Sequence, residues 1–105
     1  MKQYKVMILS EAQRDLQKRI DYIVFVLKNK QAAKSVMLDY NNTIKVLSNI
    51  AGSIREPENK LLQERQLKRL NLLKHDYYLL FKISENTAIV TNVFHALEDI
   101  EGKFI

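Results

Sequence analysis

The hydrophobic period of the chain changes near Gln66, and this change most constrains the possible fold. Before Gln66, apolar residues recur at intervals of three and four, which is the spacing of one helix face. After it, side chains alternate as they do along a strand. The two helical stripes are Ala12, Leu16, Ile20, Ile23, Val24 and Leu27, and Ala33, Val36 or Met37, Tyr40, Ile44, Leu47 and Ala51. Two helices followed by a sheet are therefore predicted.

Local signals set the expected limits of these helices. Residues 4–9 (YKVMIL) form a short apolar run, which predicts a first strand. The next residues, S-E-A-Q, match a capping box in which the Ser10 hydroxyl accepts from the Gln13 backbone N–H. Residues 28–30 (KNK) are expected to end the first helix, and the loop 52–57 the second. Because the connection is short, the helices should form an antiparallel hairpin.

Three strands are predicted in the second half of the chain. They cover residues 66–74 (QLKRLNLLK), 77–83 (YYLLFKI) and 87–94 (TAIVTNVF). His75 and Asp76 are expected to make a two-residue turn, since Asp favours local backbone hydrogen bonds. Alternation places Leu79, Phe81 and Ile83 on one face of the sheet, and Tyr78, Leu80 and Lys82 on the other. The tail HALEDIEGKF is expected to form a short helical turn.

These elements predict a single α+β domain over residues 1–105, in the order β-α-α-β-β-β. The antiparallel helical hairpin should pack on one face of a small, largely antiparallel sheet. Tyr22, Phe25 and Val26 lie off the first apolar stripe. They are expected either to pack on the sheet or to form part of a groove for a partner.

Composition narrows the class of protein. The formal net charge is +5, and the 105 residues include two glycines, one proline and no cysteine. The absence of cysteine excludes disulfides and thiolate metal sites, and it favours a reducing, cytoplasmic location. No apolar run approaches the length of a membrane span, and the start does not resemble a signal peptide. The basic charge suits a polyanion or an acidic partner segment, or it reflects only a solvated surface.

The ionisable residues give weak signals for catalysis or metal binding. His75 and His95 lie on separate elements with no second ligand motif, so no metal site and no cofactor are predicted. His75-Asp76 is interpreted mainly as a turn rather than a catalytic pair. His95 and Asp99 are four residues apart, so on a helical turn they could bond to each other in a structural role.

Three stretches of the chain, taken in order, resemble the RelE/ParE superfamily of bacterial toxins from type II toxin–antitoxin pairs. The first, YKVMILSEAQRDLQKRIDYI, carries Ala12, Asp15, Leu16, Tyr22 and Ile23 at the family's spacing. The second, KRLNLLKHDYYLLFKI, is similar to the family's strand pair with an arginine, a turn and an aromatic run. The third, VFHALED, places His95 and Asp99 as in its closing His-x-x-x-Asp.

The resemblance is closer to the ParE branch, because of the long hairpin and the Ala-x-x-Asp-Leu opening. It implies a toxin that poisons DNA gyrase without hydrolytic residues. It also implies a cognate antitoxin whose largely helical, partly acidic C-terminal segment lies against the hairpin and sheet. Candidate antitoxin contacts are Tyr22, Phe25, Val26 and Tyr40, and candidate target contacts are Arg65, Arg69, Tyr78, Lys82, His95 and Asp99.

Two alternatives stay open beside gyrase poisoning. A RelE-like, ribosome-dependent mRNA endoribonuclease needs a base, an acid and cations at the phosphate, and would use Arg69, Lys68, Lys82, His95 and Tyr78. However, Tyr78 stands where that branch has a second arginine, and its late tyrosine falls near Phe104, which has no hydroxyl. The other alternative is an inactive, toxin-like protein that only binds an antitoxin.

Overall fold

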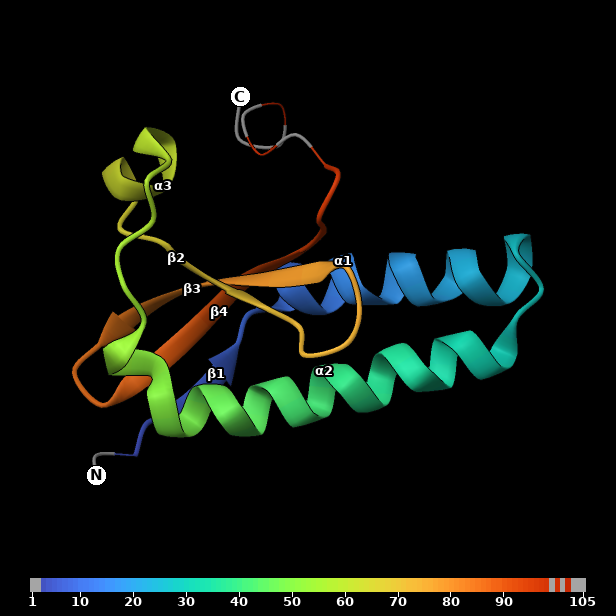
Figure 1. The fold of residues 1–105 in the computed structure, drawn as a ribbon, viewed down its shortest axis with the longest axis horizontal. Coiled ribbons are helices and arrows are strands. Elements are labelled where there is room, and N and C mark those ends of the chain that lie inside the picture. Colours follow the sequence, from blue (N-terminus) through green and yellow to red (C-terminus); the bar gives the residue numbers. More distant parts are fainter. Residues whose placement is uncertain (1–2, 99, 101, 103–105) are drawn as a thin grey trace.

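A helical hairpin covers one face of a four-stranded sheet in the computed structural model, which describes residues 3–98, 100 and 102 (Figure 1). The elements are β1 (Lys5–Ile8), α1 (Ser10–Asp21), the π-helical turn η1 (Tyr22–Val26), α2 (Lys30–Ile50), the 3-10 turn η2 (Ala51–Ser53), α3 (Lys60–Glu64), β2 (Lys68–Asn71), β3 (Tyr77–Ser84) and β4 (Thr87–His95). The far end of the hairpin projects beyond the sheet (Figure 1).

The sheet has the strand order β1-β4-β3-β2, with β1 parallel to β4 and the other pairs antiparallel. This confirms the predicted α+β class and the largely antiparallel sheet. One short helix, α3, was missed. Its N-cap is Asn59, whose side chain accepts from the Leu62 backbone N–H at 3.1 Å. A five-residue helix is too short to show a hydrophobic period, so only the capping residue marked it in the sequence.

The start of α1 differs from the predicted capping box. Leu9, not Ser10, is the N-cap residue, and no side chain within the described part of the chain caps this helix. The Leu9 N–H donates to the Val90 carbonyl at 3.0 Å, and the Leu9 carbonyl accepts from the Gln13 N–H at 3.1 Å. The hydrogen bonds of the sheet therefore continue through Leu9. The helix begins one residue earlier than a capping box at Ser10 would place it.

The hairpin connection also differs in detail. The Leu27 N–H donates to the Tyr22 carbonyl at 3.1 Å, which closes the π-helical turn, and Lys28 then reverses the chain with φ 55°. The helical segment ends at Val26 with Leu27 as its C-cap, and Lys30 already begins α2, so the predicted end within residues 28–30 is slightly too late. Asn29 has a different role from the one predicted, because its side chain caps the next helix by accepting from the Ala32 N–H at 3.0 Å.

The link between β2 and β3 is a loop rather than a two-residue turn. β2 covers only Lys68–Asn71, and the Leu72 N–H still donates to the Tyr77 carbonyl at 2.9 Å. Between them, Asp39 of α2 accepts from the backbone N–H groups of Leu73 and Lys74 at 3.1 and 2.9 Å. The predicted strand over 66–74 is therefore too long, because these amides bond to a helix side chain instead of a strand.

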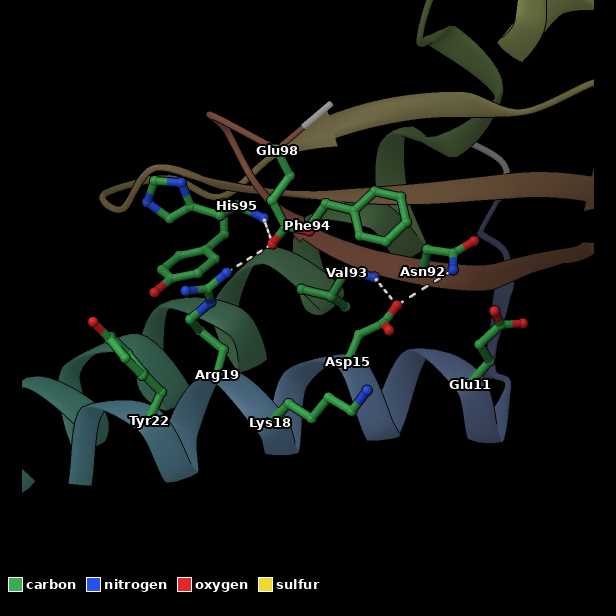
Figure 2. A pocket seen from close by; sticks show the side chains of 11 residues that line it. Glu11, Asp15, Lys18, Arg19, Tyr22, Asn92, Val93, Phe94, His95 and Glu98 are labelled. Carbon is green, nitrogen blue, oxygen red and sulfur yellow. Dashed lines mark hydrogen bonds and ion pairs between the residues drawn. The ribbon is translucent and has the colours of Figure 1, made fainter. Parts of the chain in front are cut away.

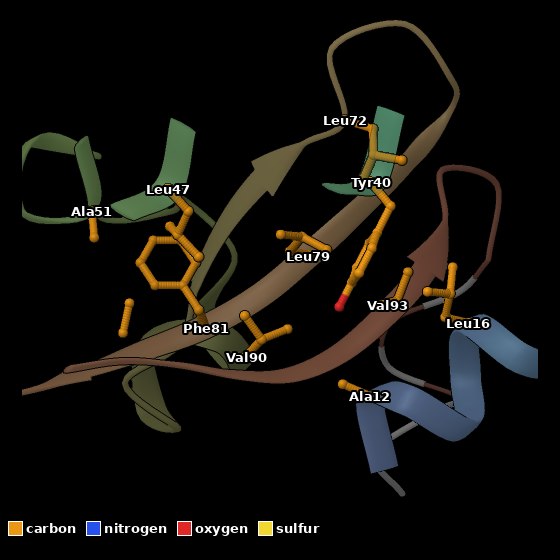
Figure 3. Packing of buried hydrophobic residues seen from close by; sticks show 11 residues of the cluster. Ala12, Leu16, Tyr40, Leu47, Ala51, Leu72, Leu79, Phe81, Val90 and Val93 are labelled. Carbon is orange, nitrogen blue, oxygen red and sulfur yellow. The ribbon is translucent and has the colours of Figure 1, made fainter. Parts of the chain in front are cut away.

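Hydrophobic cores lie on both faces of the sheet. On the helix face, Leu79, Phe81 and Val90 pack against Leu47 and Tyr40 of α2 (Figure 3). On the opposite face, the cluster consists of Leu62, Leu67, Tyr78, Leu80 and Phe94. The predicted alternation along β3 is confirmed, although α3 and its flanking residues cover part of the second face as well. Within the described residues, no helix is both long and apolar enough to cross a membrane.

Candidate functional site

A cavity of about 350 Å³, here called the α1–β4 pocket, lies between α1 and the end of β4 (Figure 2). Its lining mixes both charge signs with aromatic rings. The lining residues are Glu11, Asp15, Lys18, Arg19, Tyr22, Tyr77, Asn92, Val93, Phe94, His95 and Glu98. The α1 members recur at intervals of three and four, so they form one helix face directed at the strand.

Asp15 fixes the inner wall of this pocket. Its Oδ2 accepts from the Val93 backbone N–H at 3.1 Å and from the Asn92 side-chain amide at 3.3 Å. β1 ends at Ile8, opposite Val90, so α1 covers this part of β4 in place of a strand. Burial raises the pKa of Asp15, although the hydrogen bonds from Val93 and Asn92 oppose that rise. The carboxylate is therefore a structural acceptor that joins α1 to β4.

Arg19 is the central cation of the pocket. Its guanidinium forms an ion pair with Glu98 at 2.7 Å and lies 5.9 and 5.8 Å from the ring centres of Tyr22 and Tyr77 (Figure 2). The Tyr77 ring meets the His95 ring edge to face, with 5.1 Å between their centres. Burial raises the pKa of Tyr77, and the charge of Arg19 opposes the effect. An arginine between aromatic rings is typical of protein-binding surfaces.

His95 does not lie on the predicted helical turn. It is the last residue of β4, and its Nδ1 accepts from the Leu97 backbone N–H at 3.2 Å. Its own backbone N–H donates to the Glu98 carboxylate at 3.1 Å. His95 therefore belongs to the strand, and the chain turns directly after it, where the Glu98 backbone N–H donates to the His95 carbonyl at 2.9 Å. Asp99 and Phe104 themselves lie outside the described residues.

The hairpin-tip patch consists of Tyr22, Phe25, Val26 and Leu27, all of them exposed. Phe25 and Val26 are 68% and 62% exposed, so the expectation that they pack on the sheet is wrong. Their alternative role, as part of a partner surface, stays a prediction. Tyr22 also lines the α1–β4 pocket, which makes patch and pocket continuous.

Tyr40 was predicted to contact an antitoxin, and the structure contradicts that expectation. It is 5% exposed and packs in the main core. The apolar stripe of α2 includes Tyr40, and this stripe faces the sheet instead of a partner.

Arg69 and Lys82 lie on the other side of the sheet, whereas Lys68 pairs with Phe81 and lies on the helix side. The Arg69 guanidinium stacks on the Tyr78 ring, 3.8 Å from its centre, and its Nε donates to Asn71 at 2.9 Å. Lys68 donates from Nζ to the Ile54 carbonyl at 2.8 Å. Lys82 and Arg65 are exposed.

Tyr78 was expected to be an accessible contact residue, and this expectation is wrong. It is 0% exposed, and its hydroxyl has no hydrogen-bond partner among the described residues. Its pairing with Phe94 places it on the face opposite Tyr77 and His95, which pair with each other. The structure therefore brings Arg69 and Tyr78 together but separates both from His95.

Sequence reasoning missed several residues of interest. Arg19 and Glu98 are 79 positions apart and meet only through the fold. Asp39 was detectable, because it falls between Val36 and Tyr40 near the apolar stripe of α2. A carboxylate at such a position needs hydrogen-bond partners. Its partners include His75, whose Nδ1 lies 2.7 Å from Asp39.

Comparison with known proteins identifies the fold of this chain through solved structures rather than through sequence. No family model and no curated protein sequence matches the chain. A chain of the chromosomal ParDE TA system from P. aeruginosa superposes with a TM-score of 0.72 at 18% identity, covering 89% of this chain and 96% of that one. A chain of the toxin–antitoxin complex RelBE2 from Mycobacterium tuberculosis gives 0.58 at 20% identity, with 89% and 98% covered. The chain therefore has a RelE/ParE-like fold, and it is more similar to the ParDE structure than to the RelBE2 structure.

Proposed function

We propose that this protein is the toxin of a type II toxin–antitoxin pair, that it is ParE-like, and that a cognate antitoxin neutralises it. The observation that carries this proposal is the match over most of both chains to the ParDE structure. The motifs at the start of α1 and along β3 support the same assignment.

The antitoxin contacts the hairpin-tip patch. Four neighbouring exposed apolar residues on one turn form a surface that a monomer does not need for its own packing. An apolar groove of about 520 Å³ between α1 and α2 adjoins this end of the hairpin, and Lys30 and Lys34 line it. Apolar side chains beside lysines suit an amphipathic, partly acidic helix.

The toxin acts by binding DNA gyrase rather than by cutting mRNA. A nuclease would need its acid, base and cations at one phosphate. Here the ring of His95 and the guanidinium of Arg69 lie on opposite faces of the sheet. Lys68 already bonds to a backbone carbonyl, and Tyr78 is buried. Poisoning by a protein–protein contact needs none of these groups to converge.

Inducible expression distinguishes the candidate functions. We expect growth arrest with a DNA-damage response, inhibition of gyrase supercoiling by the purified protein, and relief of arrest by the antitoxin. Codon-linked mRNA cuts in primer extension, without a gyrase effect, would instead identify a RelE-like endoribonuclease. Antitoxin binding without growth arrest would identify an inactive toxin-like protein.

A further inference from the structure

Ser35, His75 and Asp39 form a connected chain of hydrogen bonds away from the α1–β4 pocket. The Ser35 Oγ lies 3.2 Å from His75 Nε2, and His75 Nδ1 lies 2.7 Å from Asp39 Oδ2. Ser35 and Asp39 are one turn apart on α2, and the imidazole of the β2–β3 loop bridges them. A nucleophile, a base and a carboxylate that orients the base have this same connectivity in serine hydrolases.

Asp39 is held in one orientation. Its side chain is 2% exposed, and besides His75 it accepts from the backbone N–H groups of Leu73 and Lys74. Burial favours the protonated form, but the hydrogen bonds from His75, Lys74 and Leu73 hold the pKa of Asp39 below its usual range. An ionised Asp39 accepts the Nδ1 proton of His75, which leaves Nε2 as an acceptor for the Ser35 hydroxyl.

Anchoring of the β2–β3 loop explains only part of this arrangement. The bonds of Asp39 to the loop amides and to His75 fix the loop on α2. Ser35 adds little to that anchor, because it is exposed and water can satisfy its hydroxyl. The Ser35 hydroxyl at Nε2 is therefore available for a role other than anchoring the loop.

A surface cavity of about 550 Å³ adjoins the serine. It is lined by Lys30, Gln31, Lys34, Ser35 and Leu38. The two ammonium groups can stabilise negative charge that develops on a carbonyl oxygen, and Leu38 offers an apolar wall. An ester with a short acyl chain and a good leaving group fits this combination of groups.

We propose that Ser35 is an activated nucleophile that takes an acyl group from small activated esters. Its Oγ attacks the ester carbonyl carbon while His75 Nε2 accepts the hydroxyl proton. The bond between Oγ and the acyl carbon forms, the bond to the alkoxide or phenolate breaks, and His75 returns the proton to the leaving oxygen. The product is an acyl-serine ester on α2.

The acylation is slow compared with that of a dedicated hydrolase. The backbone N–H of Ser35 belongs to the helix ladder and cannot serve as an oxyanion donor. Loss of one such donor lowers rates by a factor of about 100 to 1,000. We therefore expect a stable, stoichiometric adduct rather than rapid turnover.

Covalent labelling of the full chain tests the proposal. The probes are p-nitrophenyl acetate and a fluorophosphonate, in which the serine Oγ bonds to phosphorus and fluoride leaves. Peptide mass spectrometry locates the adduct. We expect an adduct at Ser35 that Ser35→Ala abolishes and that His75→Gln slows about 100-fold. Ser10→Ala removes another exposed helical serine and should leave labelling unchanged.

Circular dichroism confirms that each variant is folded before labelling. Ser35 is exposed, so its truncation leaves the core intact. The absence of an adduct at Ser35 in the folded wild-type chain would overturn the proposal. An adduct that forms at the same rate in folded His75→Gln would do so as well. Neither result bears on toxin activity, so this proposal and the proposed function fail independently.

Discussion

At the scale of single residues, two aspartates on the helices accept hydrogen bonds from backbone N–H groups, as a neighbouring strand would. Asp15 on α1 accepts the Val93 amide, and Asp39 on α2 accepts two amides of the β2–β3 loop. They differ in burial and in the number of donors. Asp39 is almost fully buried with three donors from the loop, whereas Asp15 is half-buried with two donors from β4.

Replacement of Asp39 by Asn should lower the free energy of unfolding by about 3 kcal/mol, since the new NH₂ group faces N–H donors in a buried site. The pKa of Asp39 is lowered on folding, so its stabilising contribution is full above the unfolded value of about 3.9 and disappears as the pH falls through the folded value. Urea unfolding from pH 3 to pH 7 measures both effects. Asp21→Asn, at an exposed site, is the control.

Asp15→Asn should behave differently. Its remaining side-chain oxygen can still accept the Val93 N–H, so the change in unfolding free energy should stay within about 1 kcal/mol. Because folding raises the pKa of Asp15, wild-type stability falls as the pH rises from about 3.9 through the folded value. The variant lacks this loss, so its unfolding free energy should rise relative to that of the wild type over that pH range. A parallel pH dependence for the Asp15 and Asp39 variants would contradict this assignment.

Among the residues that the structure describes, the buried Tyr78 hydroxyl has no partner, which is unfavourable in a core. Tyr78→Phe should therefore leave the unfolding free energy unchanged or raise it by up to about 1 kcal/mol. Thr43→Val is the matched comparison, because the buried Thr43 hydroxyl donates to the Asp39 carbonyl at 2.7 Å and its loss should destabilise. Chemical denaturation of both variants measures the contrast. A clear loss of stability in Tyr78→Phe would show that the phenol has a partner.

At the scale of elements, the hydrophobic period correctly predicted which residues pack on the sheet. It did not predict where a strand ends because its following backbone amides bond to a side chain. The hairpin stripes, apart from the exposed Leu27, follow from burial against the sheet, and alternate residues of β3 pack into the two cores on its opposite faces. The extent of β2 does not follow from burial, because the backbone N–H groups of Leu73 and Lys74, just after the strand, donate to Asp39 on a helix distant in sequence. The π-helical turn at the hairpin tip also left no periodic signal, since it spans only five residues.

This turn places Phe25 on the surface, where we expect it to anchor the antitoxin. Phe25→Asp should weaken antitoxin binding about 30-fold or more, because a central aromatic contact contributes about 2 kcal/mol or more. Its thermal unfolding should be nearly unchanged, since the side chain is exposed. Leu73→Asp alters a similarly exposed leucine on the β2–β3 loop and should bind normally. Isothermal titration with the purified antitoxin measures both affinities.

At the scale of the whole molecule, the sheet separates two surfaces of different chemistry. The helix side carries the hairpin-tip patch and the α1–β4 pocket. The other side carries Arg69 and the exposed Lys82. Sequence alternation predicted that Tyr77 and Tyr78 face opposite ways. It could not predict that α3 hides Tyr78, because the covering residues come from a short segment without a period.

On the proposed function, this separation predicts that target binding and antitoxin binding are independent. Arg69→Gln combined with Lys82→Gln removes two cations from the face opposite the helices, so it should abolish growth arrest and gyrase inhibition while antitoxin affinity stays within about threefold. Phe25→Asp should do the reverse, arresting growth even when the antitoxin is co-expressed. Growth curves with and without antitoxin, together with supercoiling assays, compare the two variants. If the folded Arg69/Lys82 variant lost both activities, gyrase and antitoxin would have to share one surface.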